Sequence, residues 1–100
     1  MKSITVTDYN KKKDKYTLLD VRELNEVAFA QINPHTNIPM GIIPVKYEEL
    51  NKESPIVIMC HTGVRSAAVC RFLEPLGYDV TNLEGGINAW SQQVDLAVPR

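Results

Sequence analysis

The chain has 100 residues, of which 44% are hydrophobic, and this size suits one domain with a core of its own, over residues 1–100. Its 11 basic and 12 acidic side chains leave a net charge of −1, so no overall field recruits nucleic acid or an anionic membrane. The composition also excludes a disordered or collagen-like chain. The longest apolar run, Ile56 to Cys60, is far too short to span a bilayer, and the N-terminus does not resemble a secretory signal. We therefore expect a small cytoplasmic protein.

The first half of the chain alternates short strands with short helices. In chain order it predicts a strand at 4–6, a helix at 9–13 capped by Thr7 or Asp8, a strand at 16–21, a helix at 23–29, an extended segment at 33–39 and a helix that starts at Pro44. The run at 16–21 is apolar without alternation, which indicates a strand covered on both faces. In the helices that follow, Val27 and Phe29 are possible core contacts, and Tyr47 and Leu50 share a face.

The second half contains the clearest strand and the clearest helix. Residues 55–60 form a continuous apolar run, typical of a central parallel strand. A helix at 66–76 follows, and Gly77 is expected to end it as a left-handed cap. Its helical period places five apolar side chains on one stripe that should face the core: Ala68, Val69, Phe72, Leu73 and Leu76. A strand at 79–83 and a short helix at 87–90 complete the pattern.

Strands that alternate with helices at this spacing predict an α/β domain built on a parallel sheet. In such sheets, ligands bind beyond the carboxyl ends of the strands. Three polar or glycine-containing segments follow predicted strands: residues 20–23, 60–66 and 84–86. They are far apart in sequence, but we expect them to share one edge of the sheet.

The loop that starts at Cys60 has the strongest chemical signal in the sequence. The loop is short, and Gly63 permits the positive φ that its curl requires. The backbone N–H groups of such a loop point inward, and the following helix adds its positive N-terminal dipole. Both effects favour ionisation of the Cys60 thiol, and Arg65 adds a cation whose planar fork suits an oxyanion. The loop therefore predicts a thiolate nucleophile that attacks an anionic substrate.

Four motifs, in register from about residue 17 to 91, resemble the rhodanese-like single-domain sulfurtransferases. They are Leu19-Asp20-Val21-Arg22-Glu23 with Glu26, Asn37-Ile38-Pro39, Cys60-His61-Thr62-Gly63-Val64-Arg65-Ser66, and Leu83-Glu84-Gly85-Gly86-Ile87 with Ala89-Trp90. The resemblance implies a five-stranded, mainly parallel sheet flanked by helices on both faces. Residues 30–36 depart from the Gly-His-Ile-x-Gly-Ala that such domains often have, which leaves the conformation and partners of that loop open.

The resemblance also implies a chemistry, in which Cys60 is the catalytic residue that carries sulfane sulfur as a persulfide. Backbone amides would cradle this sulfur or the incoming anion, with Arg65 assisting. The implied substrate-binding residues are His61, Thr62, Gly63, Val64, Arg65 and Ser66. The expected donor is a small anion, thiosulfate or another persulfide, and the expected acceptor is a thiol or a protein cysteine. No metal or organic cofactor is implied, because the covalent intermediate divides the transfer into two easier displacements.

Several other residues have structural interpretations. Two cysteines make neither a disulfide framework nor a zinc motif. We interpret Cys70, at the margin of the helical stripe, as a structural thiol, because the intervening residues place it more than a helical turn away from Cys60. His61 either tunes the pocket or points outward. Asp20 and Arg22 are expected to fix the turn and to pair with neighbouring charges. Gly85 and Gly86 are expected to serve backbone geometry, and Trp90 is expected to lie in the core.

Two other functions remain open at this stage. A cysteine phosphatase or arsenate reductase of the same fold would use a Cys-x5-Arg loop, whereas Cys60 to Arg65 is Cys-x4-Arg, and this shorter loop favours sulfur. The third hypothesis is a non-catalytic rhodanese-like module for sulfur delivery or binding. It is less favoured because the chain retains the cysteine.

Overall fold

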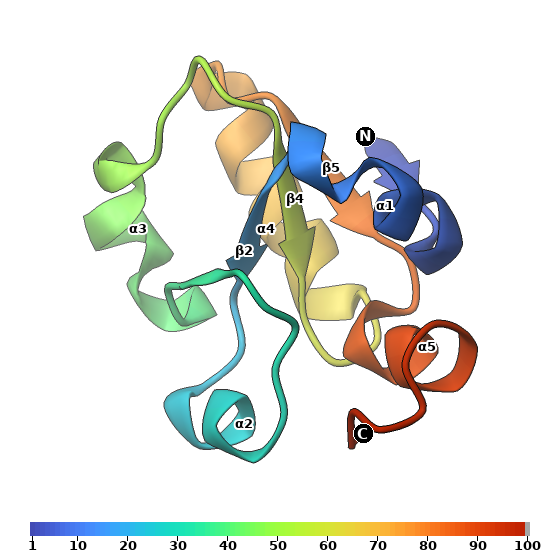
Figure 1. Cartoon of the computed structure of the whole chain (residues 1–100). Coiled ribbons are helices and arrows are strands. Elements are labelled where there is room, and N and C mark those ends of the chain that lie inside the picture. Colours follow the sequence, from blue (N-terminus) through green and yellow to red (C-terminus); the bar gives the residue numbers. More distant parts are fainter. Residues whose placement is uncertain (100) are drawn as a thin grey trace.

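The computed structural model describes residues 1–99, and a five-stranded sheet forms the centre of this part of the chain (Figure 1). The strands are β1 (Lys2–Ile4), β2 (Thr17–Asp20), β3 (Thr36–Asn37), β4 (Ile56–Met59) and β5 (Val80–Leu83). Neighbouring strands are all parallel, in the order β1-β5-β4-β2-β3. The central strand, β4, is buried along its whole length. The α/β class and the five-stranded parallel sheet are thus confirmed.

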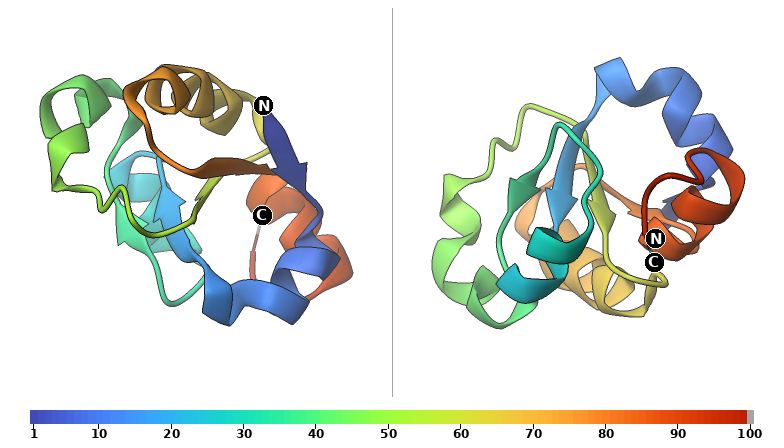
Figure 2. Two further views of the ribbon diagram at one scale, coloured as in Figure 1. Left: turned by 90° about the horizontal axis from the view of Figure 1, so that it is seen from above. Right: turned by 60° about the horizontal axis from the view of Figure 1, so that its bottom comes forward.

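Helices cover both faces of this sheet, as Figure 2 shows. The α-helices are α1 (Val6–Lys12), α2 (Leu24–Phe29), α3 (Ile43–Lys46), α4 (Val64–Leu73) and α5 (Gly86–Gln93). Short 3₁₀ turns add η1 (Lys13–Lys15), η2 (Met40–Ile42), η3 (Tyr47–Glu49) and η4 (Glu74–Leu76). No helix within residues 1–99 has both the length and the apolar character that crossing a membrane would require.

The alternation of side chains along the strands divides the core into two layers. Ile56 and Ile58 of β4 pack with α4 residues such as Leu73. Tyr47 and Leu50, which were predicted to share a face, both pack against this layer. Val57 and Met59 face the other way, toward α1 and α5. In that second layer Trp90 is buried and stacks edge-on against Tyr9 of α1, which confirms its predicted place in the core.

The N-terminal boundary differs from the prediction. β1 ends at Ile4, which pairs with Leu83, and α1 already begins at Val6. Thr5 caps this helix, because its Oγ1 accepts a hydrogen bond from the Asp8 backbone N–H at 3.2 Å. The predicted first strand is therefore found, but two residues earlier than 4–6, and the predicted caps Thr7 and Asp8 are wrong. The β-branched Val6 serves the buried face of a helix, not a strand.

Helix α2 is not a core helix. Phe29 is 67% exposed, so its predicted core contact is wrong, and Val27 is only half-buried. The helix is short and is held by polar contacts: Glu23 and Glu26 form a reciprocal capping box at its first turn. Its position is therefore determined by hydrogen bonds and not by apolar packing.

Helix α4 starts at Val64, two residues earlier than predicted, and η4 replaces its last turn around Pro75. Its buried face consists of Ser66, Ala67, Val69, Cys70 and Leu73. Of the predicted stripe, Val69 and Leu73 are buried, Ala68 is only half-buried, and Phe72 and Leu76 are 39% and 36% exposed. Phe72 packs edge-on against Tyr47 instead, with 5.7 Å between ring centroids. Gly77 has φ 94°, which confirms the left-handed cap.

Candidate functional site

The segments that follow β2, β4 and β5 meet at one edge of the sheet, as predicted. Residues Asp20 and Met59 are partners in the register of β2 and β4, and Ile58 and Asn82 are partners in that of β4 and β5. A Cβ at Gly63 would lie 3.4 Å from the backbone nitrogen of Gly85, so the loops after β4 and β5 are in close contact. This edge carries the Cys60 loop.

The sulfur of Cys60 lies inside a ring of donors. It accepts hydrogen bonds from the backbone N–H groups of Gly63, at 3.1 Å, and Ser66, at 3.4 Å, and it lies 3.3 Å from the Ser66 hydroxyl oxygen. The residue is 1% exposed. Burial by itself would raise the pKa of the thiol, but the hydrogen bonds from Ser66, Gly63 and Thr62 outweigh it and lower the pKa below its usual value.

The curl of this loop depends on Gly63, whose φ of 105° lies in the left-handed region that favours glycine. Gly63 also forms the N-cap of α4, so the first turn of that helix begins directly beside the sulfur. The helix N-terminus adds a positive potential to the amides that point at Sγ. The loop therefore has the geometry that the sequence predicted from a glycine between a strand and a helix.

Helix α5 holds the outer side of the loop. The backbone N–H of Ile87 donates to the carbonyl of Cys60, and that of Asn88 donates to the carbonyl of His61, both at 3.0 Å. Gly86 allows this approach, because a Cβ at that position would lie 2.6 Å from the His61 carbonyl oxygen. The glycine motif therefore serves backbone geometry, as expected: it lets one helix terminus fix the loop.

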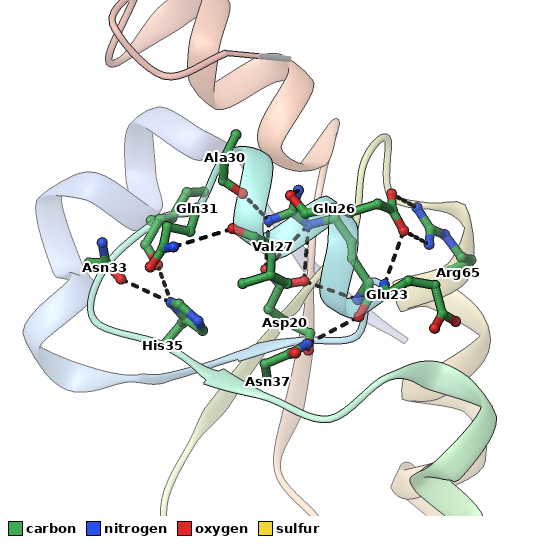
Figure 3. Close-up of polar contacts among 12 residues, drawn as sticks. Asp20, Glu23, Glu26, Val27, Ala30, Gln31, Asn33, His35, Asn37 and Arg65 are labelled. Atoms are coloured by element: carbon green, nitrogen blue, oxygen red, sulfur yellow. Dashed lines mark hydrogen bonds and ion pairs between the residues drawn. The ribbon is translucent and has the colours of Figure 1, made fainter.

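Arg65 contacts a carboxylate beside the loop (Figure 3). Its Nη1 and Nη2 donate to the two carboxylate oxygens of Glu26, at 2.7 and 2.8 Å. The hydrogen bonds from Arg65 lower the pKa of Glu26 to about 2. Glu26 lies on α2, so this pair connects α2 to the first turn of α4. The guanidinium expected to assist an incoming anion is thus already engaged in a bidentate pair.

A second arginine, Arg22, also holds α2 in place through hydrogen bonds. Arg22 is 3% exposed and pairs with Asp20, with 2.8 Å between Nη2 and Oδ2. Its guanidinium also donates to the backbone carbonyls of Glu26 and Ala30, near the end of this helix. Asn37 of β3 donates to the carbonyls of Asp20 and Arg22, at 2.8 and 3.1 Å. These residues have the structural role that the sequence analysis assigned to Asp20 and Arg22.

The remaining loop residues lie toward solvent. His61, Thr62 and Val64 are exposed. His61 borders a small cavity of about 200 Å³ that Phe29, Ile87 and Pro99 also line. Its backbone carbonyl is held by α5, and among the described residues its side chain makes no hydrogen bond to Sγ. Whether His61 tunes the pocket or points outward stays a prediction.

Sequence reasoning did not identify two contacts of the sulfur nest. Ser66 was expected to contribute its amide, but its hydroxyl also lies against Sγ and donates to Asn82 Oδ1. Asn82 was not identified at all. A signal was present: asparagine is disfavoured in strands, yet it occurs inside the predicted strand at 79–83, and a buried amide must have partners.

No group of three or more His, Cys, Asp or Glu residues in the described part of the chain is placed to hold a metal ion. The two cysteines are free thiols with different surroundings. Cys70 lies within α4 and is fully buried in the core, and this burial raises the pKa of its thiol to about 11. The site therefore has one sulfur with donors directed at it, that of Cys60.

Comparison with known proteins assigns the family. Residues 5–93 match the rhodanese-like domain. The chain is 45% identical over 73 residues to YtwF of Bacillus subtilis, whose name classes it provisionally as a sulfurtransferase; the match covers 73% of this chain and 71% of YtwF. A protein of Allochromatium vinosum named sulfurtransferase is 40% identical over 76 residues, covering 75% of this chain and 71% of the relative.

A solved structure agrees with this assignment. The rhodanese-related protein of Thermoplasma volcanium superposes with a TM-score of 0.92 at 35% identity, over 94% of each chain. The chain therefore belongs to the rhodanese-like family of sulfurtransferases, which confirms the resemblance seen in the four motifs.

Proposed function

We propose that this protein transfers sulfane sulfur from an anionic donor to a thiophilic acceptor through a persulfide on Cys60. The observation that supports the proposal most is the ring of donors around Sγ, from Gly63 and Ser66, which lowers the pKa of a buried thiol. A thiolate, and not a thiol, is the nucleophile in sulfur chemistry. The nest therefore favours the reactive, ionised form of the sulfur.

In the first half-reaction, the Cys60 thiolate attacks the outer sulfur of thiosulfate. A bond forms between Sγ and that sulfur while the sulfur–sulfur bond of thiosulfate breaks, and sulfite leaves with the bonding electron pair. The product is a Cys60 persulfide anion. The amides of residues 61–66 would cradle the terminal sulfur and the departing anion, because they lie at the helix terminus that surrounds Sγ.

In the second half-reaction, an acceptor nucleophile attacks the terminal sulfur of the persulfide. The Sγ–S bond breaks, the Cys60 thiolate is regenerated, and the acceptor leaves as thiocyanate or as a persulfide of its own. Cyanide serves as the acceptor in an assay, and a thiol or a protein cysteine serves in the cell. The two displacements balance without metal or redox cofactor, because sulfur moves between nucleophiles.

The surroundings of the loop bear on the donor and the location. Arg65 can assist an anionic donor only if it shares its guanidinium with Glu26 or releases it. A thiosulfate dianion must compete with that carboxylate, whereas a thiol persulfide need not, so both donors belong in the test. The two free cysteines fit a reducing compartment, and we propose the cytoplasm.

Intact-mass spectrometry under non-reducing conditions tests the proposal. The protein is treated separately with thiosulfate and with glutathione persulfide, and an adduct of one sulfur atom is expected. Cys60→Ser should lose the adduct and Cys70→Ala should keep it. If the wild-type protein forms no adduct with either donor, the result would support a non-catalytic module. If wild type, but not Cys60→Ser, hydrolyses an aryl phosphate or reduces arsenate, the result would support the phosphatase or the arsenate reductase.

A further inference from the structure

We propose that Asn82 is a positioning residue that competes with Cys60 for the hydroxyl proton of Ser66, and so controls how much of Cys60 is ionised. The effect on sulfur transfer rests on the function proposed above, but the effect on the thiol itself does not. Nothing in the four motifs assigns a role to Asn82, which precedes the last of them by one residue.

Asn82 lies one strand away from the Cys60 strand and faces the same layer. It is the partner of Ile58 in the register of β4 and β5, and the strand alternation turns its side chain toward α4, as for Val80. The residue is only 7% exposed. Burial of an amide in this apolar layer destabilises the fold unless its donor and its acceptor both form hydrogen bonds. The two contacts of the Asn82 side chain meet this requirement.

Both ends of the Asn82 amide contact residues that also contact Sγ. Nδ2 donates to the backbone carbonyl of Gly63 at 3.2 Å, and Oδ1 accepts from the Ser66 hydroxyl at 2.5 Å. The orientation of the amide follows from the chemistry, since a carbonyl oxygen can only accept and therefore requires Nδ2. Oδ1 must then face Ser66. The hydroxyl of Ser66 has a single proton, and the structure directs it to Asn82.

The competition arises when Cys60 ionises. While Cys60 is a thiol, Sγ–H can donate to Ser66 Oγ and Ser66 can donate to Asn82, so all three groups are satisfied. A thiolate has no proton to give, and Ser66 can then donate either to Asn82 Oδ1 or to Sγ, which lies 3.3 Å away. Hydrogen bonds to a charged acceptor are stronger than those to a neutral amide. Asn82 therefore stabilises the thiol form, and removal of Oδ1 should release the proton to Sγ.

The same competition affects the catalytic cycle. In the persulfide state the negative charge lies on the terminal sulfur, and Sγ is neutral, so the Ser66 proton can return to Asn82. When the acceptor takes the terminal sulfur, Sγ becomes charged again and the proton can turn toward it. Ser66 thus assists the departure of the Cys60 thiolate, and Asn82 sets how readily that happens.

Asn82→Val tests the competition directly, because valine suits a buried strand and has no acceptor. We measure the rate of iodoacetamide alkylation of Cys60 from pH 5 to 10, in a Cys70→Ala background. At pH 7 the Asn82→Val protein should be alkylated about three- to tenfold faster than the same protein with Asn82 retained, and its pH profile should be displaced to lower pH. An unchanged profile, or one displaced to higher pH, would overturn the proposal, because that is what a merely structural role predicts.

Three further variants make the result specific. In a Ser66→Ala background the substitution Asn82→Val should no longer accelerate alkylation, since the shared proton is gone. Acceleration that persists without the hydroxyl would contradict the proposal. Asn82→Asp loses the Gly63 contact, as valine does, but keeps an acceptor for Ser66 and adds a negative charge, and both of these disfavour the thiolate, so its rate should stay below that of Asn82→Val. Thr81→Val, on the opposite face of β5, is the matched control for strand composition and should leave the profile unchanged.

The other charges around the loop are the same in all these variants. They are Arg65 on α4, Glu23 and Glu26 before and within α2, the Asp20–Arg22 pair at the end of β2, and His61 in the loop. Thermal melting of each variant checks that the fold is intact. Alkylation needs no persulfide, so the two proposals can fail separately. A displaced alkylation profile without a sulfur adduct would refute the proposed function and support this inference. A sulfur adduct with an unchanged alkylation profile would support the proposed function and refute this inference.

Discussion

The two cysteines of this protein are equally buried, but the pKa values of their thiols are shifted in opposite directions. Cys60 and Cys70 are 1% and 0% exposed and belong to the same apolar layer of the core. The pKa of Cys60 is lowered, whereas burial and the neighbouring Glu74 raise the pKa of Cys70 to about 11. Burial therefore does not decide reactivity here. The difference lies in the donors: Cys60 follows a strand and faces the amides of a helix start, and Cys70 lies inside a helix whose amides are already used.

The largest expected effect is the contrast between substitutions of the two thiols. Cys60→Ser should abolish thiosulfate:cyanide sulfurtransfer, because a serine hydroxyl is not ionised at neutral pH and cannot carry sulfane sulfur. Cys70→Ala should retain activity and lose about 1 kcal/mol of stability, since it removes one buried sulfur from the core. Thiocyanate formation and thermal unfolding measure the two effects. Normal turnover by Cys60→Ser would refute the assignment of the nucleophile.

A large effect is also expected from the helix that fixes the loop. Gly86→Ala places a Cβ 2.6 Å from the His61 carbonyl oxygen, at φ 54°, so the loop or the start of α5 must move. We expect at least about a hundredfold loss of sulfurtransfer, because displaced amides no longer point at Sγ. Gly41→Ala is the control, since a Cβ there meets nothing within 4 Å. Equal activity of the two variants would show that α5 does not hold the nest.

The smallest effect is expected at the bridge between α2 and α4. The side chains of Arg65 and Glu26 are 34% and 30% exposed, so Glu26→Gln should lower the free energy of unfolding by no more than about 1 kcal/mol. The pKa of Glu26 falls from 4.5 in its unpaired reference state to about 2 in the fold. Its stabilisation is thus complete above about pH 4.5 and is lost as the pH falls toward 2. Chemical unfolding of wild type and Glu26→Gln should converge over this range; a constant difference would contradict it.

The fold was predictable where local signals and tertiary packing agree. The continuous apolar run before Cys60 indicated a central parallel strand, and Gly77 indicated a helix end; both are found. Val6 and Phe29 were predicted incorrectly because each of these residue types occurs in more than one environment. A β-branched residue can line a helix, and a short helix held by Arg22 and Glu26 can leave its phenylalanine in solvent.

The site was predictable as a backbone loop and not as a network of side chains. Cysteine, glycine and arginine at a fixed spacing indicate a curled loop at a helix start, and this much is local. The partners of that loop are not local: Glu26 pairs with Arg65 across 39 residues, and Asn82 reaches Ser66 across 16. Such pairs depend on the order of the strands, so a single sequence shows the residues but not which of them meet.

The most direct test is titration of the Cys60 thiol in a Cys70→Ala background, from the pH dependence of its alkylation or its thiolate absorbance. The donors from Gly63 and Ser66 predict a pKa clearly below that of a free cysteine, about 8.5. A value at or above that of free cysteine would show that the ring of amides does not stabilise the thiolate, and would contradict the mechanism built on it.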